Sequence, residues 1–424
     1  MDDVERRGGG AGLRLRLFAM MVLQVAVWGA WAPKLFPYMQ LLSFSPGEQA
    51  LVGSSWGIAG LLGIFFSNQL ADRNFSAERF MAASHAISAL CLLGAAFSTG
   101  FLAFFAFYLA YSLIYVPTLS VANSLALTHL PDPARDFGTV RMGGAIGWVL
   151  ASWPFIFLLS AHSTAVEIRW IFIVAALISA GMAAYCLTLP HTPPRLDNGV
   201  DKLAWRRAIK LLRQPFVAVL FLVTFLDSVV HNGYFVLADA FLTDRVGIAG
   251  NLSMVVLSLG QVAEILAMLM LGRVLAKLGW RATMIFGILG HTARFLAFSF
   301  AADNIAIIIA VQLLHGICYA FFFATVYIFV NDVFPEDVRV SAQGLFNLLI
   351  LGIGMVVASF AFPILRGMLM TPEGVDYHSL FMVPAGLAAL GALLLLFLFR
   401  PPAHGPAVIR QEAPRLSLDP GTAA

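Results

Sequence analysis

A single carboxylate, Glu264, lies within the apolar run from Leu252 to Leu271. Gln261 precedes it by three residues, so the two side chains share one face if the run is helical. A carboxylate at the centre of a bilayer costs at least about 3 kcal/mol, and such groups usually face a protein-lined pathway. The pair therefore predicts a site inside a membrane that binds a polar solute or a proton. The alternative is a buried Glu264 that a neighbouring polar side chain satisfies.

A second candidate group begins another apolar run, where Arg141 and Trp148 lie about two helical turns apart. The guanidinium could bind a solute or balance a buried carboxylate such as Glu264, and the indole could stack on a flat ring. An arginine near the end of a membrane span can instead extend its charge to the membrane surface. An aromatic residue within a span is also often a packing residue.

The run 215–242 contains an acid and a base, Asp227 and His231, one helical turn apart. Such a pair could relay protons, or the two side chains could simply pair with each other and have no role in function. Arg294 also lies deep in an apolar run, and the sequence does not identify its partner.

Amide and aromatic side chains accompany these charges. Asn232 and Phe235 share a helical face, and so do His315 and Tyr319 in the run 304–333. Groups of this kind suit a planar, polar, neutral ligand better than an inorganic ion.

The elements that carry these residues are predicted to be transmembrane helices. Of the 424 residues, 60% are hydrophobic and 12% are charged, whereas soluble domains have about 25% charged residues. Each helical crossing needs about 20 apolar residues, and no run alternates as a barrel strand would. We expect an all-α integral membrane protein with twelve spans, near residues 17–40, 48–70, 80–98, 101–128, 138–160, 168–189, 215–242, 250–272, 281–300, 304–333, 340–366 and 380–399.

The distribution of basic residues predicts the orientation in the membrane. They are concentrated before the first span, after the second and eighth spans, in the central connection and after the last span. By the positive-inside rule, both termini and the central connection are cytoplasmic, in an inner (plasma) membrane. The bias is explained by topology, so we expect no nucleic-acid partner.

The chain divides into two similar halves. We expect an N-terminal six-helix bundle (1–190), a cytoplasmic linker (191–214), a C-terminal six-helix bundle (215–400) and a cytoplasmic tail (401–424). Short basic turns follow spans 2 and 8, which is typical of duplicated transporter halves. A cluster of small residues in span 5 predicts a tight contact between helices; it consists of Gly143, Gly144 and Gly147.

Several chemistries have no motif in the chain. No phosphate-binding Gly-x-x-x-x-Gly-Lys-Ser/Thr, His-Glu-x-x-His or nucleophile-elbow motif occurs. The three cysteines, Cys91, Cys186 and Cys318, are isolated in apolar runs and are expected to be inert. We therefore expect no enzyme activity, no cofactor and no metal, and any uphill transport would use an ion gradient.

Asp72-Arg73, between spans 2 and 3, resembles the loop motif of the major facilitator superfamily, although Asn68 stands where a glycine is usual. In that superfamily the motif is a gate element. The resemblance therefore implies gating roles for Asp72 and Arg73.

An ordered set of short segments over most of the chain resembles the nucleoside:H+ symporter family within that superfamily. The segments are Trp28-Gly29-Ala30-Trp31, Pro117-Thr118-Leu119 with Asn123, Arg141 with Ile146-Gly147, Leu187-Thr188-Leu189-Pro190-His191, Gln261 with Glu264, Arg294-Phe295, and Arg339 with Ser341-Ala342-Gln343-Gly344. The resemblance implies proton-driven nucleoside uptake by two six-helix bundles. It assigns ligand contacts to Arg141, Trp148, Asn232, Phe235, Gln261, Glu264, His315 and Tyr319.

Two departures from the family pattern bear on the substrate and on the coupling group. Ala145 stands where members have a threonine, and Ala320 stands where known nucleoside permeases have an aspartate. If Ala320 replaces a proton carrier, Glu264 or Asp227 must take that role.

We expect a monomer in the lipid bilayer that binds a nucleoside and protons at a site between the bundles and moves by alternating access. The alternatives are a transporter of the same fold for another solute, such as a sugar or a drug, and a membrane sensor.

Overall fold

The computed structural model describes residues 2–131, 133–194, 209–334 and 336–401, without the side chains of 2–11, 64–74, 133–135, 336–338, 340 and 341. These residues form helices joined by short loops, with one small antiparallel hairpin of β1 (Met370–Thr371) and β2 (Gly374–Val375). The linker residues 195–208 and the tail 402–424 lie outside the described residues.

The N-terminal half packs its long helices into one bundle. Its elements are α1 (Asp2–Trp31), η1 (Ala32–Lys34), α2 (Leu35–Leu41), α3 (Pro46–Asn74), α4 (Ala77–Phe97), α5 (Phe101–His129), α6 (Pro133–Ser152), α7 (Phe155–Leu158), α8 (Ala165–Ile168) and α9 (Trp170–Cys186). Helix α1 packs against α6 and α9, and α5 packs against α3 and α4.

The C-terminal half forms the second bundle. Its elements are η2 (Leu211–Arg213), α11 (Pro215–Asp244), α12 (Gly250–Phe300), α13 (Ile305–Ala310), η3 (Val311–Leu313), α14 (Leu314–Cys318), η4 (Tyr319–Ala324), α15 (Thr325–Val333), α16 (Glu336–Asn347), η5 (Leu348–Ile353), α17 (Gly354–Met368) and α18 (Tyr377–Leu398). Helix α11 packs against α17 and α18, and α12 packs against α14 and α18.

The helices agree with the predicted twelve spans. Ten stretches in the described part are long and apolar enough to cross a membrane. One of them, Gly250–Phe300, consists of two helices that join at Gly279, where a φ of 70° breaks the helix. Helix α3, with 29 residues, occupies the remaining predicted span. The prediction of an all-α, multi-pass membrane protein is confirmed.

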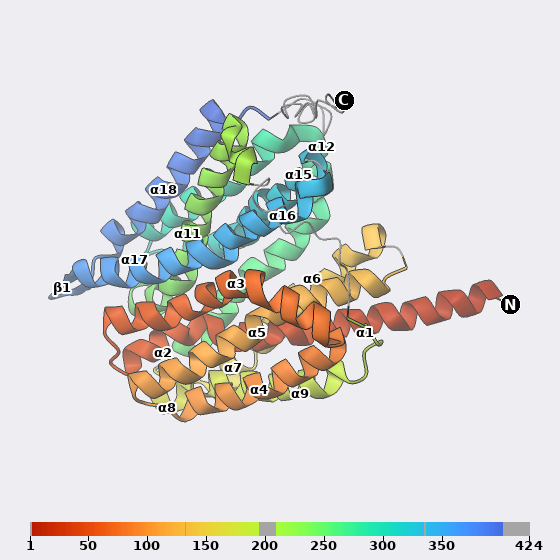
Figure 1. Ribbon diagram of the computed structural model, residues 1–424. Coiled ribbons are helices and arrows are strands. Elements are labelled where there is room, and N and C mark those ends of the chain that lie inside the picture. Colours follow the sequence, from red (N-terminus) through yellow and green to blue (C-terminus); the bar gives the residue numbers. More distant parts are fainter. Residues whose placement is uncertain (1, 132, 195–208, 335, 402–424) are drawn as a thin grey trace, which may run out of the picture.

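The two bundles meet mainly at one end of the molecule, which we call the Lys34 end because α1 ends there at η1. Helix α3 packs against α17 and η5 of the other bundle, and α6 packs against α12. Figure 1 shows α3 and α17 side by side near the hairpin, whereas α6 and α16 diverge toward the end at which α1 begins. The bundles therefore close on each other at the Lys34 end.

The glycine cluster of span 5 makes the tight contact that its small residues predicted. A methyl group at Gly147 of α6 would overlap the backbone carbonyl of Val22 in α1. Because only glycine permits this approach, α1 and α6 pack backbone to backbone. This contact fixes the face of α6 that carries Arg141 and Trp148.

Candidate functional site

Aromatic side chains from both bundles meet between the two halves. Trp28 of α1 stacks on Trp56 of α3, with ring centroids 4.8 Å apart, and packs edge to face with Trp148 of α6, with centroids 5.2 Å apart. Trp148 in turn lies 5.7 Å from the Phe235 ring of α11, in the other bundle. The predicted ligand-stacking residues Trp148 and Phe235 are thus in contact across the interface between the bundles.

Arg141 lies about two turns along α6 from Trp148 and reaches across to the C-terminal bundle. Its Nη1 donates a hydrogen bond to Oδ1 of Asn123 on α5, at 3.1 Å. The guanidinium also interacts electrostatically with the Tyr319 hydroxyl and the Glu264 carboxylate of the C-terminal bundle. Arg141 is solvent-exposed, so it remains accessible to a ligand while Asn123 orients it.

Gln261 and Glu264 share a face of α12, as their spacing predicted, and Glu264 is the more accessible of the two. A methyl group at Gly316 of α14 would overlap the backbone amide of Glu264. Since glycine permits this close approach, α14 presses against α12 at the level of the carboxylate. Tyr319, one turn beyond Gly316, is thereby held near Glu264.

Two π-helical segments, η4 and η5, lie beside these residues. A π-helical turn changes the hydrogen-bond register, and such turns are frequent at functional sites. The Ser228 hydroxyl of α11 is within hydrogen-bond distance of the η5 carbonyls of Leu349 and Ile350, at 3.0 Å each. The Asn232 amide donates to the Ser228 carbonyl at 2.8 Å and to the Ile350 carbonyl at 3.4 Å. The Asn232 amide group therefore ties α11 to η5.

His315 lies inside the C-terminal bundle, where its ring is stacked between two others. The His231 ring and the Tyr234 ring each lie with their centroid 4.8 Å from that of His315. Its Nδ1 accepts a hydrogen bond from Arg294 at 2.8 Å. His315 therefore lies between the buried Arg294 and Phe235, whose ring is perpendicular to its own with centroids 5.4 Å apart.

Asp227 does not hydrogen-bond His231, one helical turn away on the same helix. Its carboxylate lies 3.8 Å from Nε2 of His291 on α12 instead. His291 and His315 both hydrogen-bond Arg294, so these two histidines are the partners of Arg294 that the sequence did not identify. A signal for one of them was present in the sequence, because His291 and Arg294 are three residues apart on one helix.

A buried ion pair that the sequence did not lead us to expect joins the two bundles. Nζ of Lys34 in η1 lies 3.0 Å from Oδ2 of Asp239 in α11, and the two side chains are 3% and 2% exposed. The Ser253 hydroxyl of α12 donates to Oδ1 of the same carboxylate at 2.6 Å. Both charges stand within apolar runs, so the rule that singled out Glu264 applied to them as well.

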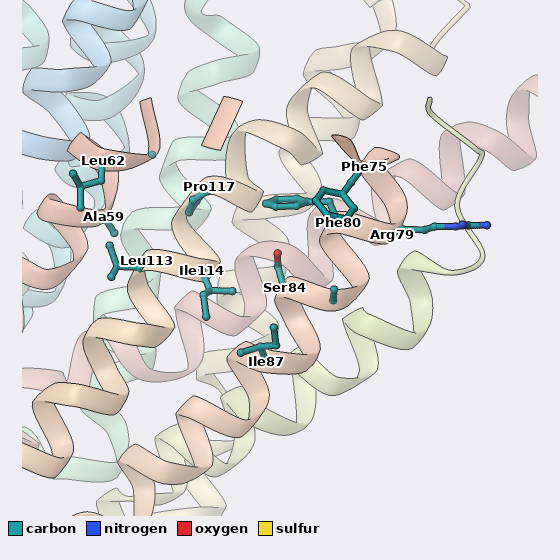
Figure 2. Close-up of a pocket in the computed structure, with 12 residues that line it drawn as sticks. Ala59, Leu62, Phe75, Arg79, Phe80, Ser84, Ile87, Leu113, Ile114 and Pro117 are labelled. Carbon is teal, nitrogen blue, oxygen red and sulfur yellow. The ribbon is translucent and has the colours of Figure 1, made fainter. Parts of the chain in front are cut away.

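An apolar pocket of about 550 Å³ lies between α3, α4 and α5 of the N-terminal half, and Figure 2 shows the side chains that line it. Leu62, Ile87, Leu113 and Ile114 line it, and the Arg79 side chain extends away from Leu113 and Ile114. None of the predicted site residues is among its lining residues. The lining has few polar groups to orient a polar solute, so we do not assign the site to this cavity.

The candidate site consists of charged and aromatic side chains from both bundles. Arg141 and Trp148 come from the N-terminal bundle, and Glu264, Tyr319 and Phe235 come from the C-terminal bundle. A relative movement of the bundles therefore changes every cross-interface contact at once. The predicted gate residues Asp72 and Arg73 lie at the end of α3, outside the residues whose side chains are described.

Comparison with known proteins agrees with this arrangement. A family model described as nucleoside H+ symporter matches residues 11–404. The Escherichia coli (strain K12) protein YegT is 31% identical over 350 residues, covering 81% of this chain and 82% of YegT. The xanthosine permease of the same organism is 27% identical over 423 residues, covering 95% of this chain and 99% of the permease. A crystal structure of a variant of the nucleoside transporter NupG superposes with a TM-score of 0.81 at 25% identity, covering 92% of this chain and 100% of that one. The chain is therefore a transporter rather than an enzyme, and it belongs to the nucleoside:H+ symporter family of the major facilitator superfamily.

Proposed function

We propose that this chain takes up nucleosides together with protons by alternating access. The observation that carries the proposal is the electrostatic interaction of Arg141 with Tyr319 and Glu264 between the bundles, on the helix that also carries Trp148 of the aromatic pair Trp148–Phe235. Stacking surfaces and hydrogen-bonding groups together suit a flat base linked to a hydroxylated sugar. Family membership and the likeness to NupG support the same substrate class.

The ligand-binding residues divide by chemistry. Trp148, Phe235 and Tyr319 pack against the base, while Gln261 and Arg141 hydrogen-bond its polar edge or the ribose. Asn232 and His315 act from behind, because the Asn232 amide nitrogen already binds η5 and the His315 Nδ1 already binds Arg294. These two residues hold the side of the ligand site that the C-terminal bundle forms in its shape.

Glu264 and Asp227 carry the coupled protons. Glu264 lies at the proposed ligand site, where a proton and a nucleoside can bind together, and Asp227 is buried in α11 of the same bundle. Asp72 and Arg73 act as a gate at the end opposite to Lys34. With Ala320 in place of an aspartate, these two carboxyls are the acidic side chains that we assign to coupling.

We further propose that both termini are cytoplasmic in an inner membrane, so the Lys34 end faces the periplasm. The bundles are residues 1–190 and 215–400, with cytoplasmic segments at 191–214 and 401–424, and the protein acts as a monomer. The present conformation, closed at the Lys34 end, is then the one closed to the periplasm. The distribution of basic residues supports this orientation.

Uptake of radiolabelled uridine into proteoliposomes tests the proposal. With an inward proton gradient, wild-type protein should accumulate uridine, and unlabelled nucleosides should compete while sugars do not. Glu264→Gln should abolish accumulation but retain exchange, whereas Glu373→Gln on the exposed hairpin should match wild type. Competition by sugars alone would instead identify the alternative solute class. Accumulation by Glu264→Gln equal to that of wild type would remove Glu264 from the coupling step.

A further inference from the structure

Asp227 is a buried carboxyl without hydrogen bonds in the described part of the chain. It lies in the middle of α11 with 1% of its surface exposed, and neither of its oxygens has a hydrogen-bond partner among the described residues. His291 Nε2, at 3.8 Å, is too distant for a hydrogen bond and is itself buried and unpaired within that part. Burial without hydrogen bonds disfavours the ionised form of a carboxyl. This geometry suits a group that carries a proton.

Several titratable or charged groups face Asp227. They are His231 on its own helix, His291 and Arg294 on α12, and Cys318 on α14. The elements η1, α2, η2, α17 and α18 also pack against α11 or lie at its ends. Their described charged or titratable side chains lie near the ends of α11, namely Lys34, Tyr38, Arg213, Arg366, Tyr377 and His378.

Arg294 fixes the protons of two histidines. A guanidinium can only donate, so Nδ1 of His291, at 2.9 Å, and Nδ1 of His315, at 2.8 Å, must both accept. In their neutral forms both rings then carry their proton on Nε2. Nε2–H of His291 therefore faces the Asp227 carboxyl, and a small approach would complete a hydrogen bond.

The same arginine connects Asp227 to the ligand site. Its guanidinium lies 4.0 Å from the centre of the Tyr234 ring, which stacks on His315. The edge of His315 contacts Phe235, which meets Trp148 across the interface. One buried cation therefore interacts both with a carboxyl that can change its charge and with a ring that supports the ligand site.

We propose that Arg294 transmits the protonation state of Asp227 to the ligand site through His291 and His315. The arrangement described here is that of protonated Asp227, with Arg294 held by the two histidines. When Asp227 loses its proton, the carboxylate attracts Nε2–H of His291 and the guanidinium, and Arg294 leaves His315. The His315 ring then loses its anchor and the ligand site loosens. The proton enters from one side of the membrane and leaves to the other, and no other bond changes. This proposal rests on the proton-coupled uptake proposed above and adds positioning residues to it.

The pH dependence of uridine affinity tests the proposal with purified full-length protein. If ligand binding requires protonated Asp227, affinity should fall about tenfold for each pH unit above the titration of that group. Asp227→Asn mimics the protonated form, so the ratio of affinities at pH 6 and pH 8 should shrink by about tenfold or more. Asp227→Glu keeps a carboxyl that can be protonated, so it should keep a pH ratio close to that of wild type. Asp303→Asn, at an exposed carboxyl paired with Arg245, should keep the wild-type ratio.

The variants of the relay distinguish transmission from packing. Arg294→Gln and His291→Phe should each reduce the pH ratio as Asp227→Asn does, since both interrupt the connection. A change of overall affinity with an unchanged pH ratio would mark a purely structural role and would overturn the proposal. A wild-type ratio of affinities at pH 6 and pH 8 in Asp227→Asn would also overturn it. If one of the three variants fails to fold, a wild-type ratio in the variants that do fold would have the same consequence. Wild-type protein that neither binds nor transports any nucleoside would instead refute the proposed function.

Discussion

Replacing Lys34 by methionine should shift the protein away from the conformation closed at the Lys34 end. Methionine keeps most of the side-chain volume but removes the ammonium that lies 3.0 Å from Asp239. Removing one partner of a buried ion pair costs about 3–5 kcal/mol, because the remaining charge stays buried. In a conformation open at this end, water would solvate Asp239, so the penalty applies to the closed conformation alone. Each 1.4 kcal/mol is a factor of ten, so the closed-to-open ratio should fall by about two to three and a half orders of magnitude.

Spin labels on the two bundles can measure this shift. Ser43 of the N-terminal half and Glu373 of the C-terminal half are both exposed at the Lys34 end. Double electron–electron resonance between labels at these positions should give a short, narrow distance distribution for wild type. Lys34→Met should add a longer component, or replace the short one.

Two further variants decide whether the ion pair is the cause. Lys34→Met combined with Asp239→Leu removes both charges, so no unpaired charge stays buried. The double variant should therefore recover the population with the short distance, or increase it above that of wild type. Arg245→Gln breaks an exposed ion pair with Asp303 at the same end and should change the distribution little. An unchanged distribution in Lys34→Met, or an equal effect of Arg245→Gln, would refute the reasoning.

Three more predictions follow from the site. Trp148→Ala should weaken nucleoside binding by about five- to one-hundred-fold in calorimetry, because stacking of an aromatic ring on a base contributes about 1–3 kcal/mol. Gly316→Ala should lower the melting temperature, because the added methyl overlaps the α12 backbone, whereas Gly181→Ala should have a small effect since nothing lies within 4 Å of it. Asn123→Ala should raise the KM for uptake several-fold, because it frees Arg141 from the 3.1 Å hydrogen bond that orients it.

Much of the fold was predictable, because each span is a local property of the chain. Apolar length and the scarcity of charge predict the helices, and the glycines of span 5 predict the contact of α6 with α1. The same reasoning identified Glu264 and Arg141 as unusual within their spans. The structure brings these two into electrostatic interaction although they lie in different halves of the sequence.

The partners of the buried charges were not predictable, because they depend on how separate helices pack. Lys34 and Asp239 meet across the two bundles, and the apolar runs around them gave no indication of each other. The spacing in the sequence pairs Asp227 with His231 on its own helix, but in the structure His291 of α12 lies 3.8 Å from its carboxylate. The π-helical register of η4 and η5 is also absent from the hydrophobic pattern, because one extra residue per turn changes hydrogen bonds without changing composition.

The position of the charges on two separate bodies explains how movement can be coupled to protons. Arg141 belongs to the N-terminal bundle, and Glu264 belongs to the C-terminal bundle. A nearby cation changes the proton affinity of a carboxyl, and the effect depends on their separation. In the proposed mechanism, rocking of the bundles alters this separation, so Glu264 binds the proton with a different affinity in each conformation. By linkage, binding of the proton must then favour one conformation over the other. Placing Arg141 and Glu264 within one bundle would fix their separation and remove this contribution to coupling.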